Sequence, residues 1–135
     1  MKKILLDLNV VLDYLDQRAG HEAAARIIDD CVLGKVAGYV CAHEITTLSY
    51  FLEKSLADKR EVIKIIGKLL KMFDVIAVNA EILTRALSSN ILDYEDAVVE
   101  TSAQAQKIDA IITRNLKDFR ASRIKAISPE TYLAL

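Results

Sequence analysis

The sequence has little glycine and proline, with 4 glycines and 1 proline among 135 residues. It is 53% hydrophobic and 27% charged, and it contains no internal repeat or linker. Such a composition indicates a compact globular chain and argues against a disordered one. We therefore expect one domain over residues 1–135, long enough to bury a sizeable core.

No apolar run in the sequence is long enough to cross a bilayer. The chain opens Met-Lys-Lys before an apolar stretch, as a signal peptide would, but Asp7 and Asp13 interrupt that stretch. No small-residue cleavage site follows directly. We expect a cytoplasmic protein with no membrane contact.

Cysteine and histidine are also scarce, with 2 residues of each type. Cys31 and Cys41 stand in no CxxC or Cys/His ligand spacing. In a cytoplasmic protein they are expected to be reduced residues that pack in the interior. Two histidines are too few for a histidine-built zinc site.

Charge is unevenly distributed, although the formal net charge is only −1. Residues 58–71 carry five basic and two acidic side chains, and residues 107–125 carry six basic and two acidic ones. The stretch "DYEDAVVE" between them has four acids in eight residues. This separation is expected if carboxylates bind cations at one spot and bases receive an anion nearby, but ordinary solvated helix faces produce it equally well.

Short apolar strands alternate with amphipathic helices along the whole sequence. The expected strands are 3–6, 38–42, 74–78, 110–113 and 124–127. The expected helices are 10–17, 21–33, 43–56, 59–73, 79–87 and 93–107, with a last one starting at Ser128-Pro129-Glu130. The alternation predicts an α/β fold, a three-layer α/β/α sandwich with a mostly parallel central sheet of about five strands.

Polar side chains follow the predicted strands, at the edge where parallel α/β sheets bind their ligands. Asp7 lies within the apolar stretch "ILLDLNVVLDYL", where a carboxylate is costly to bury without a partner. Glu44 follows the second strand, and Asn115 and Asp118 follow the fourth. These side chains are therefore expected at one edge of the sheet.

Two further acids, Asp93 and Asp96, open the helix before the fourth strand and can share one of its faces. Beside Asp7 and Glu44 they would repel one another and raise each other's pKa values. A divalent cation removes this repulsion, and oxygen ligands without His or Cys favour Mg²⁺ or Mn²⁺ over zinc.

Several of these residues, though not Asp7, also have a simpler interpretation. Asp93, Asp96 and Glu44 are typical acids of a helix N-terminus. Asp118 could be a turn residue, and Asn9 is either a helix cap or a partner that holds Asp7 in place.

Three segments in order resemble the PIN domain: "ILLDLNVVLDYL", "AHEITTLSYFL" and "LDYEDAVVETSAQAQKIDAIITRNLKDF". The resemblance runs from Lys3 to the closing "AISPETYLAL", is strongest in the last segment, and is closest to the branch containing VapC-like ribonuclease toxins. It implies a PIN-like fold and a Mg²⁺- or Mn²⁺-dependent endoribonuclease, the toxin of a toxin–antitoxin pair. RNA is implied by the family alone, because no residue here reads a 2′-hydroxyl.

The resemblance also assigns roles residue by residue. Asp7 matches the first-strand aspartate, Glu44 the glutamate on the helix after the second strand, and Asp96 the aspartate that opens the later helix. Asp93 is an extra carboxylate beside Asp96. By this resemblance all four are catalytic residues and metal ligands, and Asn115 and Asp118 complete the expected catalytic set.

The sequence departs from the family pattern at one position. The family often has aspartate in its T-x-D-x-x-F segment, where this sequence has Asn115, with Asp118 three residues later. A neutral amide binds a cation less well, so either Asp118 compensates or Asn115 only positions water or substrate. Thr113, Arg114 and Lys117 are near enough to this segment to contact a substrate phosphate.

The resemblance further implies a cognate antitoxin protein, which inserts a segment into the acidic groove, and a homodimer. Two other interpretations stay open. A catalytically weak or silent PIN-like module would bind RNA or a protein partner, with Asn115 as the argument for it. A phosphatase of the haloacid-dehalogenase type also begins with an apolar strand and an aspartate, but it normally has aspartate where Asn9 stands.

Overall fold

The structure is a computed structural model that describes residues 1–135, with five strands and seven helices; two helices follow each of the first three strands, and no helix separates the last two strands. The strands are β1 (Lys3–Leu6), β2 (Ala37–Cys41), β3 (Asp74–Ile76), β4 (Ala110–Ile112) and β5 (Ala126–Ile127). The helices are α1 (Leu8–Asp16), α2 (His21–Val32), α3 (Ala42–Ser55), α4 (Lys59–Met72), α5 (Ala80–Ala86), α6 (Tyr94–Ala105) and α7 (Pro129–Leu133). The predicted α/β fold is confirmed.

All neighbouring strands pair in parallel, in the order β3-β2-β1-β4-β5. The sheet is therefore wholly parallel, where the sequence predicted a mostly parallel one. Strand β1 pairs with β2 on one side and with β4 on the other, so the strand order reverses between β1 and β4. Ligands of such sheets bind beyond the carboxyl ends of the strands at this reversal, because the chain leaves the two strands in opposite directions there.

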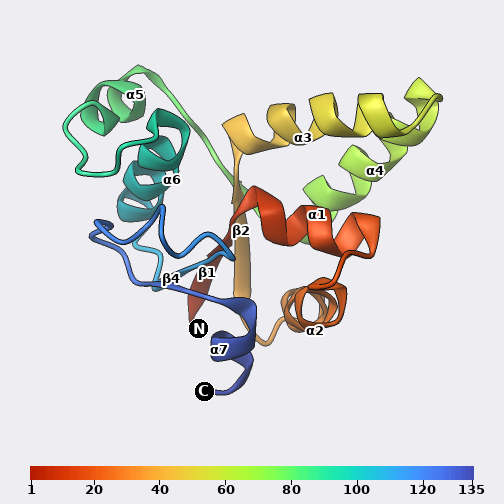
Figure 1. The fold of residues 1–135 in the computed structure, drawn as a ribbon, viewed down its shortest axis with the longest axis horizontal. Helices are drawn as coiled ribbons and strands as arrows, with labels where there is room; N and C mark the ends of the chain where they lie inside the picture. Colours follow the sequence, from red (N-terminus) through yellow and green to blue (C-terminus); the bar gives the residue numbers. More distant parts are fainter.

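The central strand β1 supplies both faces of the sheet with apolar side chains. Ile4 and Leu6 are buried in one core cluster and Leu5 in the other, as the two-residue period of a strand requires. Helices α1 to α4 and α7 pack into the first cluster, and α5 and α6 into the second. The two groups of helices lie on opposite sides of the sheet in Figure 1, which gives the predicted three layers.

The ends of several elements differ from the predicted ranges. Helix α1 begins at Leu8 rather than residue 10, because the Asp7 carboxylate accepts a hydrogen bond from the Leu8 amide and caps the helix. Strand β3 stops at Ile76, since its partner β2 ends at Cys41 and leaves residues 77–78 nothing to pair with. Strand β5 is shortened likewise, because only Ile111 and Ile112 of β4 face it.

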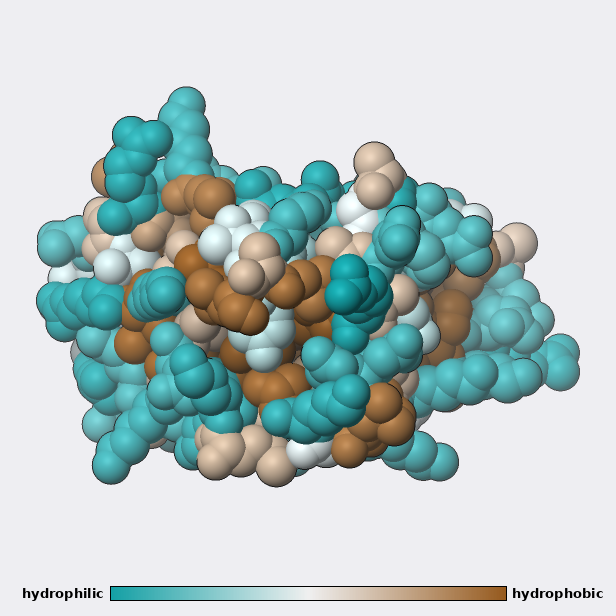
Figure 2. All heavy atoms as spheres, turned by 90° about the horizontal axis from the view of Figure 1, so that it is seen from below, coloured by the Kyte–Doolittle hydropathy of each residue, from teal (hydrophilic) through white to brown (hydrophobic).

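Figure 2 shows the face of the molecule that lies below in Figure 1, where α7 and the N-terminus are found. Apolar side chains form a broken band across this face and are bordered by hydrophilic ones. The strands start at this face, so the candidate site described next lies at their opposite ends. No helix is both long and apolar enough to span a membrane.

Candidate active site

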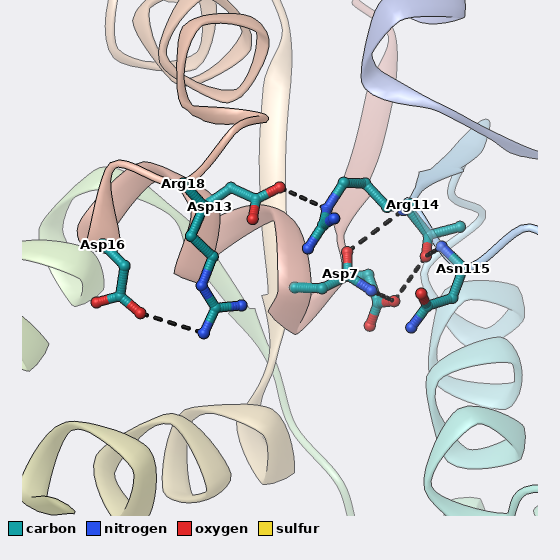
Figure 3. A network of polar contacts seen from close by, with 8 residues as sticks. Asp7, Asp13, Asp16, Arg18, Arg114 and Asn115 are labelled. Atoms are coloured by element: carbon teal, nitrogen blue, oxygen red, sulfur yellow. Dashed lines mark hydrogen bonds and ion pairs between the residues drawn. The ribbon is translucent and has the colours of Figure 1, made fainter. Parts of the chain in front are cut away.

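Asp7 lies at the centre of the site, directly after β1, and is 4% exposed. Its backbone amide continues the parallel ladder by donating to the Ile112 carbonyl at 2.9 Å. Its Oδ2 atom accepts hydrogen bonds from the Thr113 hydroxyl at 2.7 Å and from the Asn9 side-chain amide at 3.0 Å (Figure 3). The carboxylate of Asp7 is thus held in one orientation by a residue of α1 and a residue of the segment that follows β4.

A hollow of about 220 Å³ opens in front of this carboxylate. Its lining combines residues from the segment after β1, the helices α3 and α6, and the loop after β4. The lining residues are Asp7, Leu8, Asn9, Leu12, Glu44, Phe51, Glu95, Asp96 and Asn115. The structure therefore brings together Asp7, Glu44, Asp96 and Asn115, as expected from their places after strands and at a helix start.

Glu44 is buried in the first turn of α3, 4% exposed, and its Oε1 atom has no hydrogen-bond partner. Burial raises the pKa of its carboxyl group well above the usual range, and the neighbouring Asp7 raises it further. A buried acidic oxygen without a partner is uncommon in folded proteins, because its desolvation is not compensated. Glu44 is therefore a strong candidate for a ligand-binding group.

Asp96 lies in the first turn of α6 and faces the same hollow. Partial burial, followed by the negative charges of Asp7, Asp93 and Asp118, raises the pKa of Asp96 to about 7. Glu95 adds a smaller effect in the same direction. Acidic side chains gather around this hollow without a basic side chain among its lining residues, so the hollow favours a positively charged ligand.

Asp93 and Asp118 do not line this hollow. Asp93 caps α6, with its Oδ1 atom accepting from the Asp96 amide at 3.0 Å, so the helix-terminal interpretation describes its contact. Both residues line a neighbouring hollow of about 460 Å³, together with the basic residues Lys117 and Arg120. They influence the Asp7 site through charge, as the pKa of Asp96 indicates.

The loop after β4 holds the residues expected near a substrate phosphate. Thr113 is completely buried, and its hydroxyl donates to Asp7 while accepting from the Asn115 amide at 3.0 Å. The backbone amide of Arg114 donates to Oδ1 of Asn9 at 3.3 Å. Thr113 and Asn9 thus both hold Asp7, and Asn9 lies inside α1 rather than capping it, because Asp7 itself is the cap.

Two residues at the site have no role in the sequence-based prediction. Glu95 lines the hollow next to Asp96, and the dense acidic run "DYEDAVVE" was the available signal. Asp13 is 1% exposed and forms an ion pair with Nε of Arg114. No sequence signal pointed to this pair, because its members lie at opposite ends of the chain and meet only through the packing of α1 against the loop after β4.

The donor set of the hollow matches the preferences of a hard divalent cation, since it offers carboxylate and amide oxygens and no sulfur or imidazole ligand. The unpartnered Oε1 atom of Glu44 supports this fit. As the side chains stand, however, no three acidic, histidine or cysteine groups meet closely enough to enclose a metal ion. The chemistry of the residues fits a cation, and the carboxylates would have to draw together around it.

These observations define a class of protein: a wholly parallel α/β sandwich with buried carboxylates gathered where the strand order reverses. Residues 3–117 match the family model described as the PIN domain, and the chain belongs to this family. The resemblance in the sequence is thereby confirmed, and the phosphatase interpretation is left without support. No curated protein matches the chain significantly.

Several solved structures share the fold over nearly the whole chain. VapBC2 from Rickettsia felis, bound to a DNA fragment from its promoter, has a TM-score of 0.75 at 12% identity and covers 93% of this chain and 98% of that one. A toxin–antitoxin complex from Klebsiella pneumoniae has a TM-score of 0.70 at 21% identity, covering 93% and 97%. VapC20 from Mycobacterium tuberculosis, a sarcin-ricin loop cleaving toxin, has a TM-score of 0.65 at 13% identity, covering 90% and 98%. The fold is therefore similar to that of VapC toxins.

Proposed function

We propose that this protein is a Mg²⁺- or Mn²⁺-dependent endoribonuclease, the toxin of a toxin–antitoxin pair. The observation that carries the proposal is the buried pair Asp7 and Glu44, in which one acidic oxygen of Glu44 has no partner. Such a pair is unfavourable in an otherwise well-packed domain unless it binds a positive charge. Membership of the PIN domain family and the likeness to VapC toxins support a nuclease.

Asp7, Glu44 and Asp96 would hold the cation, with Asp93 and Asp118 adding negative charge from the neighbouring hollow. When bound, a divalent cation neutralises these carboxylates, attracts the substrate phosphate and makes water more acidic. Asp7 is already oriented for this role by Thr113 and Asn9, so little reorganisation of that residue is required.

The other residues of the site would bind and orient the RNA. Asn115 lines the hollow and supplies a neutral amide that can hold water or a substrate oxygen. Lys117 and Arg120 border the neighbouring hollow and can contact backbone phosphates on either side of the cleaved bond. Leu12 and Phe51 add apolar surface to the lining of the hollow.

The proposed protein partners are a cognate antitoxin and a second copy of the chain. The toxin–antitoxin complexes among the similar structures support the first. For the second, Ile63 and Leu70 of α4 leave apolar surface exposed beside the groove between α3 and α4. Light scattering of the purified protein tests the homodimer, and co-purification with the product of a small neighbouring reading frame tests the antitoxin.

A catalytically weak or silent PIN-like module is the second candidate. Two observations favour it: the neutral Asn115 stands where the family often has an acid, and no three acidic groups meet around one point. In this alternative the negative hollow would bind a basic segment of a protein partner, with an arginine pairing the carboxylates.

A cleavage assay separates the two candidates. Single-stranded RNA and DNA oligonucleotides of the same sequence are incubated with the protein in Mg²⁺, in Mn²⁺ and in EDTA. We expect RNA cleavage that requires the cation and falls at least about 100-fold in Asp7→Asn. Asp16→Asn, which removes a carboxylate of an exposed ion pair on the same helix, serves as the control and should be fully active. Equal, cation-independent rates in wild type and Asp7→Asn would overturn the proposal.

A further inference from the structure

Asp13 is a buried carboxylate that the proposed chemistry does not use. It lies on α1, four residues after Asn9, so the two side chains share a face of the helix. Neither of its oxygen atoms forms a well-aligned hydrogen bond, and its one ionic partner is Nε of Arg114. Because a charge this deeply buried is costly alone, the pair restrains Arg114 strongly.

The Asp13 side of this ion pair is tightly packed. A Cβ atom at Gly20 would lie 2.5 Å from Oδ2 of Asp13 and 3.6 Å from Cδ of Arg114. The start of α2 therefore packs closely against the Asp13 carboxylate, and only glycine fits there without a shift. Figure 3 shows Arg114 reaching from the loop after β4 across to Asp13 on α1, away from the pair formed by Asp16 and Arg18.

Arg114 makes two polar contacts with α1. Its side chain pairs with Asp13, and its backbone amide donates to Oδ1 of Asn9 at 3.3 Å. The residues on either side of it complete the site: Thr113 donates to Asp7, and Asn115 lines the acidic hollow. Any displacement of Arg114 would thus also shift Thr113, which orients Asp7, and Asn115, which lines the hollow.

We infer that Asp13 and Arg114 are positioning residues, which fix the segment 113–115 against α1 and thereby set the orientation of the Asp7 carboxylate. The inference rests on the proposed function for its catalytic consequence. The competing role is direct binding of a substrate phosphate by Arg114, whose side chain is 41% exposed. The Nε atom of Arg114 is already paired with the buried Asp13 carboxylate, which holds the guanidinium group against α1. A side chain that followed a substrate phosphate would need to move, so this pairing favours positioning.

The test compares Asp13→Asn, Arg114→Gln and the double variant, with Asp16→Asn as the matched control. Positioning predicts that both single variants lower kcat for RNA cleavage about 10- to 100-fold. KM should stay within about two-fold of wild type, and the double variant should lose no more than the worse single one. Arg114→Lys, which keeps the charge but not the planar Nε contact, should recover only part of the rate.

A second measurement does not depend on activity. Amide hydrogen exchange should accelerate locally at Arg114 and Asn115 in Asp13→Asn, and not in Asp16→Asn, with the rest of the sheet unchanged. If the wild type cleaves no RNA, the proposed function fails. The exchange experiment would still show whether Asp13 fixes the segment 113–115 against α1. A raised KM in Arg114→Gln with a normal Asp13→Asn would overturn the inference in favour of phosphate binding. Lowered thermal stability with unchanged kcat and unchanged local exchange would also overturn it.

Discussion

At the scale of single residues, Thr113 links the two strands at the reversal of the sheet. Its hydroxyl donates to Asp7, 106 residues away in the sequence, and accepts from the Asn115 amide. It is completely buried, so neither contact is shared with solvent. The orientation of Asp7 therefore depends on a residue that does not line the hollow.

Replacing Thr113 with valine keeps the shape of the side chain and removes the hydroxyl. We expect Thr113→Val to lower the free energy of unfolding by about 1–3 kcal/mol, because Asp7 loses a donor and the Asn115 amide loses its acceptor. RNA cleavage should fall about 10- to 100-fold. The matched control is Thr101→Val, since the Thr101 hydroxyl is also buried but donates to the Ala97 carbonyl within α6. Urea unfolding and the cleavage assay measure both effects, and full activity in Thr113→Val would contradict the role.

Asp96 gives the protein a pH dependence with a defined sign. Its pKa rises from 3.8 to about 7 on folding, so between these values the folded chain keeps a proton that the unfolded chain has released. The stability that this group contributes is complete below about pH 4 and is lost as the pH rises towards 7. Glu44 acts in the same direction, because burial raises the pKa of its carboxyl group too.

We therefore expect the thermal midpoint in EDTA to fall from pH 5 to pH 8, and the fall to be smaller in Asp96→Asn. Differential scanning fluorimetry measures it, with Asp16→Asn as the control that should follow the wild-type slope. Addition of Mn²⁺ should raise the midpoint more at pH 8 than at pH 5, because protons compete with the cation for these carboxylates. If the thermal midpoint fell equally with pH in wild type and in Asp96→Asn, the raised pKa of Asp96 would be contradicted.

At the scale of elements, two glycines in or beside helices differ in the space around them. Gly67 lies in the middle of α4, where a Cβ atom would have no neighbour within 4 Å. Gly20 lies at the start of α2, where a Cβ atom would collide with the Asp13 side chain of α1. We expect Gly67→Ala to stabilise the protein by about 0.5–1 kcal/mol through the higher helix propensity of alanine. Gly20→Ala should destabilise it by about 1–3 kcal/mol, because the added methyl group displaces a buried ion pair. Urea unfolding of the two variants tests this, and equal stabilisation by both would contradict the packing described.

The element boundaries show where local sequence patterns stop being informative. The sequence predicts a helix from residue 10, but α1 starts at Leu8 because the Asp7 side chain caps it while also serving the site. Asp93 is likewise outside α6 as its cap. Asn79, the first residue of the predicted helix 79–87, is the cap of α5, and its side chain accepts from the Ile82 amide. Periodicity identifies a helix, whereas its ends are set by individual hydrogen bonds.

At the scale of the whole molecule, the alternation of strands and helices was sufficient to predict the parallel sheet and its layers. The rule that ligands bind beyond strand ends also predicted the meeting of Asp7, Glu44 and Asn115, and the position of Asp96 at a helix start placed it with them. The placement of Asp118 in a neighbouring hollow was not predictable, because a loop residue's direction depends on tertiary packing. The pair of Asp13 and Arg114 was beyond prediction for the same reason, since neither residue has a local partner that would signal it.

Isothermal titration of Mn²⁺ into wild type and Asp7→Asn at pH 8 tests the central claim most directly, namely that the acidic hollow holds a divalent cation. The account predicts saturable binding to the wild type and a loss of at least about ten-fold in affinity in Asp7→Asn, with Asp16→Asn unchanged. Absence of binding to the wild type, or equal binding to both proteins, would contradict it.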